Sequence, residues 1–239
     1  MIDFTKAIKR PFSDATKMGI GFAMSLPIPF VEYFTNIAAT GYALNCAKTA
    51  YEGKYELPEW KNLGRYWLQA FIAAIISFLY NLPVLLLLLY FGGDIISDFI
   101  TDSTALYLNL LNNPLSIVNQ YGTQILIPVS VAIIISYFVP VAILKYIIND
   151  KFDFAFKGDV FKKALTTEYF YVWIIVNSVD LIFVFFMMRI IYPFLNQEIN
   201  PATLFYLILL TVLVYLISFA LSIFRYTVYG SLLKYLEKT

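Results

Sequence analysis

Long apolar runs separated by short polar segments dominate this sequence. Four of the runs are as long as the roughly 20 residues that a membrane-spanning helix needs, and they cover residues 66–91, 123–148, 169–191 and 202–230. The pattern predicts an all-α fold, a polytopic membrane helix bundle with four full spans.

The apolar block 18–47 is too long for one straight span and too short for two full ones. Pro27 and Pro29 interrupt it about a third of the way along, where proline breaks a helix. We expect a helical hairpin of two unequal arms, about 18–26 and 30–47. A re-entrant dip and a single kinked span are the alternatives. The hairpin brings the number of membrane elements to six, in a single integral membrane domain, 1–239.

Two polar segments mix basic and apolar residues, as interfacial helices do. One is the N-terminal stretch 1–17. The other is 149–168, in which Phe156, Val160 and Ala164 recur at helical spacing. Both are expected to contribute interfacial amphipathic helices. The N-terminal stretch should be short and broken near Pro11, with a frayed tail as the alternative. Within 149–168 a helix on the inner membrane surface is expected, with Asp159 as a candidate cap.

The basic residues are distributed unevenly. Sixteen of the 17 Lys and Arg residues fall in 1–17, 48–65, 145–163 and 225–239, and none occurs from Tyr66 to Leu144. Cytoplasmic loops are enriched in Lys and Arg. We therefore expect a multi-pass protein of the cell membrane with both termini cytoplasmic and 92–121 outside.

The amino-acid composition limits the classes of protein to which this chain can belong. The chain is 60% hydrophobic and 14% charged, whereas soluble domains carry about 25% charged residues. A net charge of +1 gives no argument for a nucleic-acid partner. Without histidine there is no ordinary neutral-pH base, and Cys46 has no histidine to activate it. No catalytic, metal or cofactor motif is present, so we expect no enzyme, no metal site and no cofactor.

Asp180 lies in the middle of the run 169–191, with Asn177 one helical turn earlier. A carboxyl group at mid-bilayer is costly and must face protein or water. We expect a neutral Asp180 in the bundle interior, hydrogen-bonded to Asn177, Thr211 or Tyr215. Such a group is either a proton or cation site or a packing residue.

A polar stripe follows the last apolar run at steps of three and four residues. Its members are Thr211, Tyr215, Ser218, Ser222 and Arg225. Such a stripe faces other helices or a wet cavity, with Arg225 expected near the inner membrane surface. Glu32, close to the hairpin turn, completes the candidate intramembrane polar residues.

The pair Gly41-Tyr42 and the stretch Glu56-Leu-Pro-Glu-Trp60 carry a resemblance. They resemble an uncharacterised archaeal and bacterial family of multi-pass membrane proteins, domain of unknown function 4013. The resemblance implies a membrane protein and supplies no activity. By local physics, Pro58 suits the first turn of a helix, and Trp60 and Trp67 suit a membrane interface. We therefore expect these three residues to anchor the chain at the membrane surface.

Two functions are compatible with these patterns. One is a small permease-like protein for a proton, an ion or a small solute, which Asp180, Glu32 and the stripe favour. The other is a non-catalytic membrane module that organises lipids or partner proteins. The lipid bilayer is the expected partner, and a protein partner or a second copy is compatible with either function.

Overall fold

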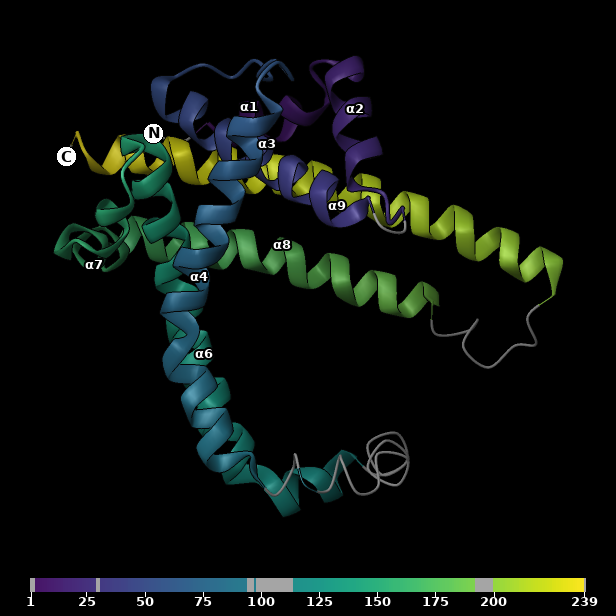
Figure 1. The fold of residues 1–239 in the computed structure, drawn as a ribbon, viewed down its shortest axis with the longest axis vertical. Helices are drawn as coiled ribbons and strands as arrows, with labels where there is room; N and C mark the ends of the chain where they lie inside the picture. The colour runs from purple at the N-terminus through teal and green to yellow at the C-terminus, as the bar shows by residue number, and fades with distance from the viewer. Residues whose placement is uncertain (1–2, 29–30, 94–96, 98–113, 192–199, 239) are drawn as a thin grey trace. The chain divides into compact units, whose positions relative to one another are not determined.

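The computed structural model of the chain describes residues 3–28, 31–93, 97, 114–191 and 200–238. All regular structure in these residues is helical (Figure 1). The elements are α1 (Phe4–Lys9), η1 (Arg10–Phe12), α2 (Ala15–Ser25), α3 (Glu32–Glu52), α4 (Leu63–Phe91), α6 (Pro114–Asn149), η2 (Phe152–Phe156), α7 (Gly158–Ala164), α8 (Thr167–Ile191) and α9 (Pro201–Leu236).

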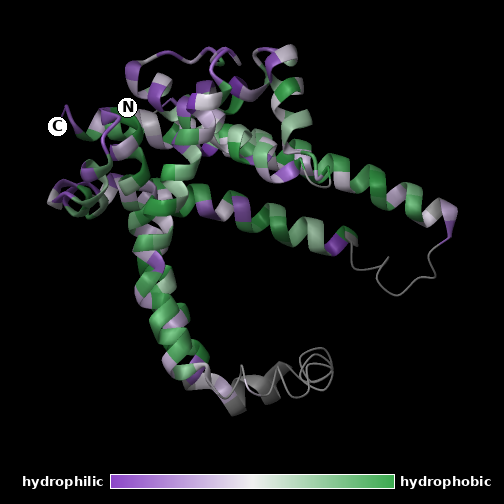
Figure 2. Ribbon diagram, in the orientation of Figure 1, coloured by the Kyte–Doolittle hydropathy of each residue, from purple (hydrophilic) through white to green (hydrophobic). Residues whose placement is uncertain are grey.

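Four of the helices are long and apolar enough to cross a membrane. They are Leu63–Phe91, Gln124–Asn149, Thr167–Ile190 and Thr203–Leu236. These helices match the four predicted spans, and the chain is a multi-pass helical membrane protein. Leucine, isoleucine and phenylalanine side chains remain exposed along α8 and the first half of α9, which Figure 2 shows as mostly hydrophobic. Such faces are what lipid covers.

The chain divides into two compact units, Met1–Ala74 with Pro140–Thr239, and Ile75–Val139. The second unit contains the later part of α4 and the earlier part of α6. Within it α4 continues through Pro83 without ending, and the Asn81 amide donates to the Ser77 carbonyl at 2.7 Å. The external segment predicted at 92–121 lies mostly outside the described residues. Whether the chain is one membrane domain stays a prediction.

The core of the larger unit forms where α3 packs on α9. Gly230 of α9 faces the α3 backbone so closely that a Cβ added there would lie 2.1 Å from the Ala47 carbonyl oxygen. The two backbones can approach this far because glycine has no side chain. Helices α1, α2 and α8 also contact α9 (Figure 1), so α9 is the axis of this unit.

The N-terminal apolar block is broken as its prolines predict. Helix α2 ends at Ser25, Leu26 is extended, and α3 begins at Glu32. However, α3 continues to Glu52, five residues beyond the predicted end, and neither α2 nor α3 is among the helices apolar enough to cross a membrane. A hairpin that adds two membrane elements therefore stays a prediction.

The structure has a helix within 149–168, as the spacing predicts. This helix, α7, begins at Gly158 beside the predicted cap Asp159; η2 precedes it, and α8 already begins at Thr167. The place of α7 on the membrane surface stays a prediction. Val160 and Ala164 are buried as the spacing predicts, whereas Leu165 is largely exposed. The segment is broken because Lys157 adopts an extended backbone between η2 and α7.

Candidate functional site

The residues of the Gly41-Tyr42 and Leu-Pro-Glu-Trp motif meet in one aromatic cluster. The rings of Tyr42 and Trp60 stack at 3.9 Å, and Tyr66 lies edge-on to Tyr42 at 5.6 Å. The Tyr42 hydroxyl donates to the Pro58 carbonyl at 3.0 Å, and the Trp60 indole donates to the Lys17 carbonyl at 2.9 Å. The cluster fastens the loop 53–62 onto α3 and α2.

Gly41 is required by the same cluster. A Cβ at this position would lie 1.8 Å from the Tyr66 carbonyl oxygen. Any side chain there would therefore force the start of α4 away from α3.

The predicted interfacial anchor is corrected in part. Pro58 does not begin a helix, because α4 starts five residues later at Leu63. Trp60 is half-buried and packs against the core of the unit. Trp67 stacks on Phe71 at 5.1 Å. Packing within the protein accounts for Trp60, and a role of these residues at the membrane surface stays a prediction.

Arg10 is the residue that the sequence patterns did not single out. Its side chain is only 1% exposed. It donates to the carbonyls of Cys46 (2.7 Å) and Glu56 (2.8 Å) and to the hydroxyls of Thr227 (3.0 Å) and Thr49 (2.5 Å). All four acceptors are uncharged oxygens, and burial lowers the pKa of the guanidinium. Arg10 therefore ties the N-terminal segment to α3, to the loop 53–62 and to α9.

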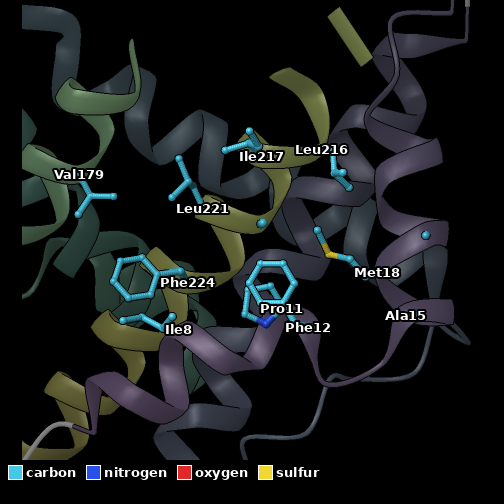
Figure 3. Close-up of a pocket in the computed structure, with 12 residues that line it drawn as sticks. Ile8, Pro11, Phe12, Ala15, Met18, Val179, Leu216, Ile217, Leu221 and Phe224 are labelled. Carbon is cyan, nitrogen blue, oxygen red and sulfur yellow. The ribbon is translucent and has the colours of Figure 1, made fainter. Parts of the chain in front are cut away.

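The residues around Arg10 form one wall of an apolar groove of about 590 Å³. Ile8, Pro11 and Phe12 face α9 across this space, and α8 contributes Val179 (Figure 3). The rest of the lining is also apolar: Ala15, Met18, Gly19, Leu216, Ile217, Ala220, Leu221 and Phe224. Pockets of about 300–1,000 Å³ are of the size that holds small ligands. No lining side chain is charged, so the groove suits a hydrocarbon.

Asp180 pairs with Arg225. The Arg225 guanidinium of α9 donates to the Asp180 carboxylate of α8, with both side chains partly buried. This pairing contradicts the predicted neutral Asp180. Asn177 and Thr211 instead donate to carbonyls of their own helices, those of Trp173 (2.7 Å) and Leu207 (2.8 Å).

The sequence does not predict this pair because helical periodicity does not set the register between α8 and α9. The rings of Tyr169 of α8 and Tyr229 of α9 pack together, with centroids 6.1 Å apart. Counted from this contact, Asp180 is 11 residues along α8 and Arg225 is 4 residues along α9, about 17 Å and 6 Å by helical rise. The long Arg225 side chain therefore extends along the helices to reach Asp180.

The rest of the stripe faces a second groove of about 190 Å³, which we call the polar groove because it holds polar side chains, although most of its lining surface is apolar. Tyr215, Ser218 and Ser222 line it from α9, together with Ser25 of α2 and residues Asn36, Ala39 and Thr40 of α3. Phe219 completes the lining, which does not include Glu32. Glu32 is the first residue of α3. The predicted polar residues therefore do not form one site. Some line this groove, Asp180 and Arg225 form an ion pair, and Asn177 and Thr211 bond within their own helices.

In the described part of the chain, no three His, Cys, Asp or Glu residues lie close enough together to bind a metal ion. Several acidic side chains there form ion pairs with lysine or arginine. Asp150 accepts from Lys48 at 2.5 Å and from Arg65 at 3.2 Å. Lys145 pairs with Asp159 at 2.5 Å and with Glu237 at 2.6 Å.

Comparison with known proteins agrees with the aromatic motif. The family model described as "Protein of unknown function (DUF4013)" matches residues 22–194, more than two thirds of the chain. The chain belongs to the DUF4013 family. The matched region includes Tyr42, Trp60 and Tyr66 of the aromatic cluster and the Asp180 side of the ion pair, whereas α1 and α9 lie outside it. No curated protein and no solved structure matches the chain.

Proposed function

We propose that this DUF4013 protein is a non-catalytic membrane module that holds a lipid acyl chain. The observation that carries the proposal is the groove of about 590 Å³ with an entirely apolar lining. Five of its residues belong to the membrane-spanning helix α9: Leu216, Ile217, Ala220, Leu221 and Phe224. A groove on a membrane span opens toward lipid, so a hydrocarbon chain is the occupant that its surroundings supply.

The N-terminal wall supports the same proposal. Ile8 is 56% exposed and Phe12 76% exposed, although both are large and apolar. Lys6 and Lys9 lie on the same short helix, α1. Exposed apolar residues beside lysines are typical of a segment at the interface of a membrane with anionic lipids. In this proposal 1–17 covers an inner-leaflet lipid, with both termini cytoplasmic in the cell membrane.

The test uses a phospholipid with a photoactivatable acyl chain, in nanodiscs. A Cβ built on Gly19 meets nothing within 4 Å, so Gly19→Trp can place its ring in the groove. We expect several-fold less crosslinking to peptides from α1, α2 and α9. Gly64→Trp is the matched control, since a Cβ there also meets nothing within 4 Å and Gly64 is not part of the groove. Equal crosslinking in both variants would count against an acyl-chain site.

A small permease-like protein is the second candidate, and the polar groove at Ser218 favours it. Asp180 supports a permease less than its sequence position suggests, because it is paired with Arg225. Flux of protons or small solutes into proteoliposomes separates the two functions. A permease should lose flux in Asp180→Asn while staying folded, and a lipid-binding module should show no flux to lose.

A further inference from the structure

The polar groove lies on the part of α9 that the membrane should cover. About 20 residues cross the hydrocarbon core, and 20 residues counted from the start of the span at Thr203 end at Ser222. Beyond this point most side chains of α9, such as Val228 and Leu232, are buried in the protein. Tyr215, Ser218 and Ser222 therefore lie in the inner part of the span.

Several hydrogen-bonding groups in the groove have open capacity. The hydroxyls of Ser25 and Ser222 donate to carbonyls of their own helices, those of Gly21 (2.8 Å) and Phe219 (2.7 Å). Asn36, Thr40 and Ser218 are exposed, and Tyr215 is half-buried. Polar groups in hydrocarbon that lack a partner cost several kcal/mol each. A ligand that forms hydrogen bonds in the groove would remove this cost.

The side chains that line the groove indicate which class of ligand it can bind. Hydroxyls and one amide are both donors and acceptors, and no lining residue is charged. An ion would have no counter-charge here, which is unfavourable at this depth. The volume of about 190 Å³ is below the roughly 300–1,000 Å³ of pockets that hold drug-sized ligands, so the expected occupant is small.

We propose that the groove between α3 and α9 binds a small uncharged group with several hydroxyls, of the size of glycerol. Free glycerol and the exposed glycerol head of a monoacylglycerol share this chemistry. The Tyr215 and Ser218 hydroxyls of α9 and the Asn36 and Thr40 side chains of α3 supply the hydrogen bonds. The buried ring of Phe219 forms an apolar surface for the carbon atoms of the ligand.

This site is separate from the apolar groove. The two grooves share α9, but none of their lining residues coincide. Filling one should leave the other open, so failure of the acyl-chain proposal does not decide this one.

The experiment measures cysteine accessibility in nanodiscs, in a Cys46→Ala background. Ser218→Cys is treated with a water-soluble thiosulfonate reagent, with and without glycerol. We expect Ser218→Cys to react and glycerol to slow the reaction several-fold, while an ammonium compound of similar size has no effect. Leu213→Cys, on the exposed apolar face of the same helix, is the control and should stay unreactive. Thr40→Cys tests the opposite wall and serves if Ser218→Cys does not fold.

The source of the hydroxyl group is resolved by a second arm. Nanodiscs that contain monooleoylglycerol should protect Ser218→Cys if the natural group is carried by a lipid, and free glycerol alone should protect it otherwise. Labelling that neither compound slows would show a groove filled by water and would overturn the proposal. An unreactive Ser218→Cys and Thr40→Cys, or a disulfide-linked dimer through Ser218→Cys, would overturn it as well.

Discussion

Arg10 shows how a single buried cation joins three parts of the larger unit. Long charged side chains are rarely fully buried unless they are paired. Arg10 instead meets four uncharged oxygens from three separate parts of the chain. Its neighbours Ile8, Pro11 and Phe12 form the wall of the apolar groove. Arg10 therefore positions that wall, although its own side chain does not line the groove.

We expect Arg10→Ala to lower the free energy of unfolding by about 2–4 kcal/mol, because hydrogen bonds to a charged group are worth about 1.5–3 kcal/mol each and the acceptors would be left buried. The matched change Lys9→Ala removes an exposed side chain and should alter the free energy by no more than about 0.5 kcal/mol. Chemical denaturation in detergent micelles measures both. Similar values for the two variants would show that the Arg10 network contributes little.

The pairing of α8 with α9 depends on one charged contact between apolar surfaces. Outside it, this helix pair is held by packing such as that of Tyr169 on Tyr229. Removing one member of a buried pair leaves the other charge without compensation, whereas removing both can be neutral. The register of the two helices is therefore coupled to Asp180 and Arg225 together.

A double-mutant cycle tests this coupling. Asp180→Asn and Arg225→Met should each destabilise the protein, and the double variant should be less destabilised than the sum of the two. We expect a coupling free energy of about 0.5–3 kcal/mol, measured by thermal unfolding in nanodiscs. Additive effects would mean that the two side chains do not interact in the bilayer.

The end of α3, the start of α4 and the end of α6 meet at Asp150. This residue follows α6 with φ of 53°, in the left-handed region, which aspartate tolerates better than most residues. Partial burial acts to raise the pKa of Asp150, but the hydrogen bond from Lys48 and the charges of Lys48 and Arg65 outweigh it and lower the pKa. The ionised form is therefore favoured by folding.

Asp150 should make stability depend on pH in the acidic range. Its folded pKa is below the unfolded value of about 3.9, so the stabilisation is present above pH 4 and is lost as the pH falls through the folded pKa. Because the side chains are partly exposed, the contribution should be about 0.2–1 kcal/mol. Melting temperatures of the wild type and of Asp150→Asn at pH 7 and pH 3 should differ less at pH 3. An equal difference at both values would exclude this linkage.

The orientation of the whole protein in the membrane rests on the charge pattern. Most Lys and Arg residues lie near the inner ends of the predicted spans, and positive residues are retained in the cytoplasm. The orientation stays a prediction.

Single-cysteine labelling checks the orientation, with Cys46 replaced. An impermeant reagent applied to intact cells should label Ser103→Cys, which lies outside the described residues, and should not label Lys157→Cys between η2 and α7. The reverse pattern would invert the topology. Labelling Lys157→Cys after the cells are opened is the control for its reactivity.

The sequence by itself determined the membrane class, the four long spans and the break near Pro27 and Pro29. Each of these depends on local properties: the length of an apolar run, or a missing backbone donor. The motif residues Gly41, Tyr42 and Trp60 were also recognisable from the sequence. Their stacking was not, because it requires α3 and the loop 53–62 to fold together.

Tertiary structure alone decided the contacts between distant helices. Helical periodicity places Asp180 and Arg225 on their own helices but does not set the register between α8 and α9, so the ion pair was missed. Arg10 resembles the basic residues around it and differs only in being covered by α3 and α9. The apolar groove is lined by five helical elements and the polar groove by three, so the shape of each depends on distances that no single element determines.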